Sequence, residues 1–364
     1  MAAKCSLWSL ARWWGLWIVA LGCAGMLLGP APARAKRPPT DRHVPELADC
    51  LGRVQIAEPV VYRQLAVYPV LLEGGAKLRG RWLSLDAALA RGVLVVSERG
   101  PEGSVPVVIV ENRSRDEHVL ILGGEILAGG KQTRTVRNDV VLSPGERVEL
   151  HVFCVEAHRW AGKGDFVAGK LLVPQSIQQE LRKGADQGKV WSEVARNNAA
   201  LAAENATGSL ETALKSKDVQ DKLGEVRRAI APHVPDGTVG FIFVERGRAA
   251  GIELFGSETL ARELLPKLLD SYAVDGLIVH KFAGEAARPE ARAAIEFYER
   301  VCRAGSERAK TPGSGAGIRT RGDGLLGDGV SLDATLVHFG VQTEHRIVPL
   351  PKPMPRPPIV PQPR

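Results

Sequence analysis

Short apolar runs separated by turn residues fill the stretch from Val93 to Glu156. In the last of them the apolar residues stand at every second position, at Val148, Leu150, Val152 and Cys154. A period of two is typical of a strand with one face on a core, and several short strands at this spacing indicate a sandwich or a barrel. The first half of the chain is therefore expected to be β-rich. The runs are Val93–Ser97, Val105–Glu111, Val119–Leu122, Thr133–Val136, Asp139–Leu142 and Arg147–Glu156.

The composition changes after Trp160. From Gln175 to Pro232 the chain is rich in Ala, Glu, Lys, Gln and Leu, which favours helices. Beyond it, Thr238–Glu245 and Ala249–Phe255 predict a β-hairpin, and Ser257 predicts the cap of a helix that Pro266 should kink or divide. The predicted fold class is α+β, with a β-rich, sandwich- or barrel-like first half, a helical middle segment and an α+β second half.

The expected domain organisation follows these changes along the chain. A signal peptide and a flexible lead precede a β-rich domain, a helical segment, and an α+β region that packs on the first domain. That region is expected to contain a flexible Gly-rich loop, and a proline-rich polyproline II tail follows it. The ranges, in this order, are 1–35, 36–49, 50–165, 166–234, 235–350 with the loop at 304–329, and 351–364.

The N-terminus predicts export. Lys4 and Arg12 precede the uncharged run Gly15–Gly29, and Ala33-Arg34-Ala35 provides an Ala-x-Ala cleavage site. The run is shorter than the roughly twenty residues that a spanning helix needs. We expect a periplasmic or secreted protein, with two alternatives: an uncleaved N-terminal membrane anchor, or a lipid attached at Cys23.

Charge and cysteine content limit the partners. Removing residues 1–35 takes away three basic residues and no acidic one, so the net charge falls from +7 to +4. This mild balance argues against a nucleic-acid partner. Cys50, Cys154 and Cys302 remain, and the sequence leaves open whether Cys50 and Cys154 form a disulfide. We expect no metal and no cofactor.

The segment from Gly123 to Arg134 is rich in glycine and contains two cations. It is no phosphate-binding P-loop, because Glu125 stands where the first glycine should be and Gln132 follows Lys131 in place of a hydroxyl. Two interpretations remain. The glycines form turns that bracket a short strand, or they let the backbone approach an anion that Lys131 and Arg134 balance.

The segment from Cys154 to Trp160 carries a thiol, a carboxylate and an imidazole. Cys154, Glu156 and His158 could be a nucleophile with its base, and with His151 they could bind a metal. Cys154, however, lies on the apolar side of its strand, where a cysteine is usually an inert core residue. The sequence leaves these alternatives open.

The motifs of both halves resemble those of a known bacterial family. It is named for its association with ADP-ribosylglycohydrolases and rhodanese-type phosphatases, and its function is uncharacterised. The resemblance spans about residues 60 to 350 and implies, by association, a nucleotide-derived or phosphorylated ligand. The motifs that carry it are Gly124-Glu125-Ile126-Leu127, Gly130-Lys131-Gln132-x-Arg134, Asp139–Leu142, Cys154-Val155-Glu156 with Arg159-Trp160, Leu254–Ser257 and Pro266–Ala273.

These observations favour a non-catalytic module that binds a small anionic ligand or an envelope protein. Its partners would include a membrane only if the N-terminal segment stays uncleaved. One alternative is a hydrolase or transferase that uses Cys154, Glu156 and His158, and another is a structural envelope protein, so enzymatic activity stays open. The expected ligand-binding residues are Glu125, Lys131, Gln132, Arg134, Glu156, Arg159 and Trp160.

Overall fold

The structure, a computed structural model, describes residues 39–100, 103–104, 106–162, 165–275 and 291–344. The predicted signal peptide and the proline-rich tail lie outside this range. The described residues form one compact unit. No helix within the described ranges has the length and apolar character that crossing a bilayer requires.

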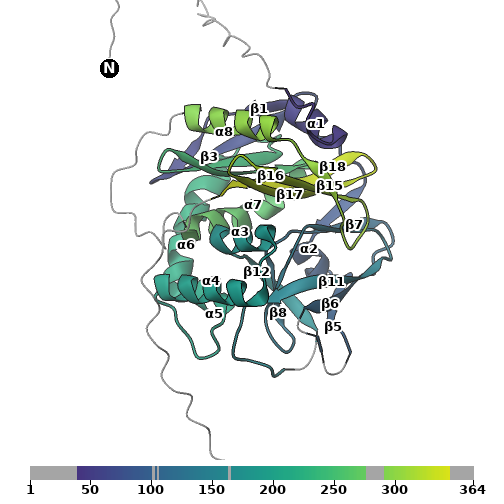
Figure 1. The fold of residues 1–364 in the computed structure, drawn as a ribbon, viewed down its shortest axis with the longest axis vertical. Helices are drawn as coiled ribbons and strands as arrows, with labels where there is room; N and C mark the ends of the chain where they lie inside the picture. The colour runs from purple at the N-terminus through teal and green to yellow at the C-terminus, as the bar shows by residue number, and fades with distance from the viewer. Residues whose placement is uncertain (1–38, 101–102, 105, 163–164, 276–290, 345–364) are drawn as a thin grey trace, which may run out of the picture. The chain divides into compact units, whose positions relative to one another are not determined.

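A nine-stranded antiparallel sheet contains both the first three strands and the last six strands of the described chain (Figure 1). Strand β3 pairs with β13 along its length, so the first strands of the chain belong to the same sheet as the last ones. The strands, in spatial order, are β1 (Val54–Ile56), β3 (Leu65–Leu72), β13 (Gly240–Glu245), β14 (Arg248–Phe255), β18 (Thr335–Thr343), β17 (Leu325–Leu332), β16 (Ala316–Gly322) and β15 (Glu307–Ala309), with β2 (Val60–Tyr62) also on β3.

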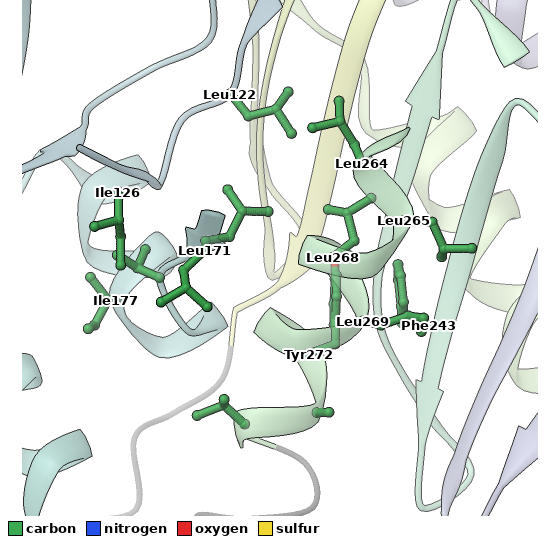
Figure 2. Close-up of a cluster of buried hydrophobic side chains, with 14 of the residues drawn as sticks. Leu122, Ile126, Leu171, Ile177, Phe243, Leu264, Leu265, Leu268, Leu269 and Tyr272 are labelled. Atoms are coloured by element: carbon green, nitrogen blue, oxygen red, sulfur yellow. The ribbon is translucent and has the colours of Figure 1, made fainter. Parts of the chain in front are cut away.

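Helices cover both faces of this sheet (Figure 1). Helices α1 (Pro45–Gly52) and α8 (Ala291–Ala304) close one core, in which Phe297 and Val301 pack among the strand residues. Helix α7 (Glu258–Ala273) lies on the other face, where Tyr272 stacks on Phe243 with ring centroids 3.8 Å apart (Figure 2). This second core also receives Leu122 and other apolar residues of the first half, so α7 binds the two halves together.

The first half is β-rich, as predicted. A six-stranded sheet and a three-stranded sheet enclose a third apolar core. The six strands, in spatial order, are β12 (Phe166–Leu172), β8 (Glu125–Gly129), β9 (Arg134–Val136), β11 (Arg147–Cys154), β6 (Val107–Asn112) and β5 (Leu94–Glu98). The other three are β10 (Val140–Leu142), β7 (Glu117–Ile121) and β4 (Arg81–Ser84).

The helical middle segment is confirmed. Its helices are α3 (Gln175–Lys183), α4 (Gln187–Ala200), α5 (Leu210–Leu214) and α6 (Lys217–Ile230), followed by the 3₁₀ turn η1 (Ala231–His233). In the first half, the short helix α2 (Leu85–Ala90) begins at Ser84, whose hydroxyl accepts from the backbone N–H of Ala87.

Two local predictions are wrong, and one of the two alternatives given for Pro266 is excluded. The segment 304–329 is not a flexible loop, because it contains β15, β16 and the start of β17. Four of its glycines, Gly317, Gly322, Gly327 and Gly329, are strand residues, and a Cβ at Gly317 or Gly329 would collide with the neighbouring strand. The lead 36–49 contains the start of α1, which Leu47 and other buried residues anchor to the sheet. Pro266 does not divide α7, which continues past it to Ala273.

Candidate functional site

The predicted Gly-rich loop and the predicted strand end meet in the structure. Gly129 and Gly130 both have positive φ values, 102° and 52°, and turn the chain from β8 towards β9. Strand β9 pairs with β11 so that Arg134 lies directly opposite Cys154. Six of the predicted ligand-binding residues therefore lie together, and with Glu98 they are called the Arg134 cluster below: Lys131, Gln132, Arg134, Glu156, Arg159 and Trp160.

Arg134 is a buried cation with incomplete hydrogen bonding. Its side chain has no exposed surface, and Nη1 donates to the backbone oxygen of Gln132 at 3.1 Å and to its Oε1 at 3.2 Å. In the described part of the chain, Nε and Nη2 have no hydrogen-bond partner, and neither has Oε2 of Glu98. The nearest approach between the two side chains is 3.9 Å, from Nη2 to Oε1. An unsatisfied buried group costs about 1–3 kcal/mol, so this arrangement needs an explanation.

Trp160 covers the cluster. The Cζ of Arg134 lies 5.5 Å from the centroid of the indole ring, and the Nζ of Lys131 lies 5.6 Å from it. Both distances are typical of cation–π contacts. Trp160 is nevertheless 47% exposed, so one residue in contact with the buried guanidinium lies at the surface.

Arg159 and Glu156 hold the Trp160 segment against the loop. Arg159 donates to the backbone oxygens of Gly129, Gly130 and Ala161, and its Nε donates to Oε2 of Glu156 at 2.9 Å. The same oxygen accepts from the backbone N–H of Thr133 at 3.1 Å. Burial by itself raises the pKa of Glu156, but these donors outweigh it and lower that pKa below its ordinary value. Glu156 is thus a fixed carboxylate that positions the segment.

Cys154 is an inert thiol in this arrangement. It is fully buried, and its Sγ donates to Oε1 of Gln132 at 3.0 Å. Burial raises its pKa to about 11, so the thiolate that a nucleophile or metal ligand requires is scarce at neutral pH. Cys50 and Cys302 are also buried free thiols, so the structure contains no Cys50–Cys154 disulfide. His158 follows the strand, and its backbone N–H donates a hydrogen bond to the backbone oxygen of Thr207 at 3.0 Å.

Glu125 does not join the Arg134 cluster. Its Oε1 lies 2.5 Å from Nζ of Lys267 on α7, and its Oε2 accepts from the backbone N–H of Leu122. Lys267 also donates to Asp86 at 2.7 Å. Burial lowers the pKa of Lys267, but the two carboxylates outweigh burial and raise it. Glu125 therefore holds α7 against the first half of the chain.

The comparison with known families agrees with the resemblance of the motifs. The profile of the ARG and Rhodanese-Phosphatase-superfamily-associated Protein domain, ARPP-1, matches residues 53–341. The chain belongs to this family. No curated protein and no solved structure gives a significant match. The matched range includes the strands of both halves, so the Arg134 cluster lies inside the ARPP-1 domain.

The ARPP-1 domain also buries a second polar centre, which the sequence did not predict. His338 of β18 lies between two carboxylates, with Nδ1 2.6 Å from Oδ2 of Asp139 and Nε2 3.1 Å from Oε2 of Glu253. Tyr272 donates to the other oxygen of Glu253 at 2.9 Å. Burial lowers the pKa of His338, but the carboxylates outweigh it and raise that pKa to about 9. These four residues are called the His338 centre below.

Next to the His338 centre, arginines gather around one aspartate. Glu253, Gly340 and Asp328 lie directly opposite one another on β14, β18 and β17. A Cβ at Gly340 would collide with Oε2 of Glu253 and Nη2 of Arg182, so only glycine leaves room for both. Asp328 faces three guanidinium groups, at 3.3 Å from Arg321, 3.7 Å from Arg319 and 4.0 Å from Arg182.

Among the residues with described positions, no group of histidines, cysteines and carboxylates has the arrangement of a metal site. His151, which the sequence analysis considered beside Cys154, lines a surface groove with Arg137 and Lys310 instead. The chemistry that the ARPP-1 domain offers is therefore that of cations, carboxylates and an aromatic ring.

Proposed function

We propose that this protein is an exported, non-catalytic binding module that holds a small anionic molecule at the Arg134 cluster. Export rests on the n-region, apolar run and Ala33-Arg34-Ala35 site of the first thirty-five residues. The expected compartment is the periplasm or the medium. The ligand chemistry rests on the donors and acceptors of the cluster.

The two unpartnered nitrogens of Arg134 carry this proposal. A guanidinium binds carboxylates and phosphates through two parallel hydrogen bonds, which a ligand with two anionic oxygens would complete. The unpartnered oxygen of Glu98 requires a donor, such as a hydroxyl group. The cluster contains three cations and two carboxylates, which leaves one positive charge. A phosphate or carboxylate with a neighbouring hydroxyl group fits these requirements.

In this proposal, Trp160 moves when the ligand reaches Arg134. The residue is about half exposed, lies near both cations and follows the end of β11, so a rotation of its side chain need not break a strand. The Arg159 contacts keep the backbone in place during this movement. Trp160 would then close over the ligand and stack on it.

The geometry gives less support to the alternative functions. A hydrolase or transferase that uses Cys154 needs an activated thiol, but this thiol is buried and bonded to an amide. Oε2 of Glu156 accepts from Arg159 and Thr133, which favours the carboxylate form and leaves Glu156 poorly suited to donate a proton to a substrate. A purely structural role in the envelope does not explain why Nε and Nη2 of Arg134 are buried without a hydrogen-bond partner among the described residues.

Thermal unfolding in the presence of ligands tests the proposal. The probes are inorganic phosphate, ribose 5-phosphate and glycerate, and the variants are Arg134→Gln and Arg113→Gln. Arg113 is an exposed arginine paired with Glu111, so its replacement controls for loss of surface charge. We expect at least one probe to raise the Tm of Arg113→Gln as much as that of the wild type, and to raise the Tm of Arg134→Gln less or not at all. Equal shifts in all three proteins, or no shift with any probe, would contradict the proposal.

A further inference from the structure

A basic groove leads from the surface towards the His338 centre. The groove has a volume of about 540 Å³ and is lined by Arg137, Asn138, Arg147, His151 and Lys310, among others. Arg137 and Asn138 also line a smaller hollow, whose other walls include Asp139, Arg182 and Asp328. The volume of the groove is in the range of small-molecule sites. Groove and hollow together form a basic entrance above a buried charged floor.

Buried polar atoms at the floor have no partner. Nη1 of Arg182 donates no hydrogen bond to any described residue, although the Arg182 side chain is only 10% exposed. Gln342 of β18 is 2% exposed, and both atoms of its side-chain amide are also unpartnered. Gln342 follows Gly340 by two residues on the same face of the sheet. Gln342 does not line the hollow, but its amide and the guanidinium of Arg182 are both buried groups without a complete set of partners, and such groups need an explanation.

The carboxylates near the hollow are already balanced. Both oxygens of Asp139 are occupied, by the backbone N–H of Gly123 and by His338. Asp328 has Arg319 and Arg321 closer to it than Arg182. Arg182 therefore shares its nearest carboxylate, Asp328, with two closer arginines. The lining of the groove contains three further cations, Arg137, Arg147 and Lys310, and one carboxylate, Glu149. An anion entering the groove meets an excess of positive charge.

We propose that this groove is a second binding site, specific for a small molecule that carries a phosphate monoester. The phosphate lies at the mouth of the hollow, between Arg137 and Arg182, and the organic part of the molecule extends along the groove towards Arg147 and Lys310. The hollow itself, at about 10 Å³, holds about one water molecule, which bridges the phosphate to the floor. Asp139 and the rest of the His338 centre position Arg182 and this water.

The groove is separate from the Arg134 cluster. Arg147 begins β11 and lines the groove, whereas Cys154 ends β11 beside Arg134. At about 3.3 Å per residue, these two ends lie about 23 Å apart. The nearest lining residues of the groove, Arg137 and His151, are three positions from Arg134 and Cys154, which is about 10 Å along the strands. The two sites therefore use different side chains, and each can be removed without the other.

Isothermal titration with ribose 5-phosphate and with inorganic phosphate tests this inference. The variants are Arg182→Gln and Arg137→Gln, each alone and in an Arg134→Gln background that removes the first site, with Arg113→Gln as the control. Arg137 is partly exposed at the groove, so its variant keeps the test valid if Arg182→Gln fails to fold. We expect ribose 5-phosphate to bind the Arg134→Gln background more tightly than phosphate does, and each added substitution to weaken it about ten- to hundredfold.

Two results would overturn the inference. The first is the absence of ribose 5-phosphate binding in the folded Arg134→Gln protein. The second is unchanged affinity in both the Arg182→Gln and the Arg137→Gln variants. A failure of the proposal for the Arg134 cluster gives a different result. In that case, the Arg134→Gln protein binds the probes with the same affinity and stoichiometry as the wild type.

Discussion

Nδ1 of His338 lies 2.6 Å from Oδ2 of Asp139, although 199 residues separate the two in the sequence. Asp139 belongs to the turn before β10 in the first half, and His338 belongs to β18 of the large sheet. Glu253 holds the other nitrogen of the ring. The ion pair therefore fixes the small sheet of the first half onto the face of the large sheet that lies under α3.

The His338 centre predicts a loss of stability at high pH. An unfolded histidine has a pKa of about 6.5, and the folded pKa of His338 is raised to about 9. A raised folded pKa stabilises the folded state fully below about pH 6.5, and this stabilisation is lost as the pH rises through 9. Urea unfolding at pH 6.5 and at pH 9.5 should show a loss on the order of 3 kcal/mol in the wild type.

The control for this experiment is His338→Gln, in which the loss between the two pH values should be much smaller. His151→Gln, at the surface groove, should behave like the wild type. A pH dependence in His338→Gln equal to that of the wild type would show that His338 is not the group responsible.

The pair of Lys267 and Glu125 predicts a strong dependence on both partners. Replacing Lys267 by Met leaves Glu125 as an unpaired buried carboxylate, and losses of this kind are about 3–5 kcal/mol. The double variant Lys267→Met/Glu125→Leu removes both charges and should recover a large part of this loss. Urea unfolding of the two proteins measures the difference, and a double variant less stable than the single one would contradict the account.

The buried cysteines predict a native protein without reactive thiols. Burial raises the pKa to about 12 for Cys50 and to about 11 for Cys154 and Cys302. In the chain that begins at Lys36, a disulfide reagent such as DTNB should label no thiol in the native state at pH 7.5 and three thiols after unfolding in guanidinium. Rapid labelling of Cys154 in the native protein would revive the thiol-based alternative.

The N-terminal segment predicts processing on export. If Ala33-Arg34-Ala35 is a cleavage site, the intact mass of the exported protein equals that of a chain that begins at Lys36. Fractionation should find this form in the periplasm or the medium. A mass that retains Met1, together with recovery in the membrane fraction, would support an uncleaved anchor instead.

The sequence was informative where structure depends on neighbouring residues. Strict alternation predicted β11, and a capping serine predicted the start of α7 at Ser257. The convergence of the Gly-rich loop with Trp160 was also expected, because both follow strands of one small region. In contrast, Glu125 was assigned to the ligand, since nothing in the local sequence reveals a partner as distant as Lys267.

The His338 centre could not be found from the sequence for two physical reasons. Its contacts join residues 85 and 199 positions apart, and such pairings leave no periodic pattern. Strand β18 also has a glycine, Gly340, at a position where a side chain would occupy the space of Glu253 and Arg182. The apolar run Val330–Phe339 predicts a strand that contains His338, but it does not reveal which residues His338 contacts.

The emission of Trp160 tests the central claim, that an anion binds at Arg134, most directly. After Ala35 the chain contains only two other tryptophans, Trp82 and Trp191, so a Trp82→Phe/Trp191→Phe protein that starts at Lys36 reports on Trp160 alone. Titration with the probe that raises the Tm should change this emission along a saturable curve, and the same protein with Arg134→Gln should show no change. A curve that persists unaltered in Arg134→Gln, or an emission that no probe changes, would contradict a ligand between Arg134 and Trp160.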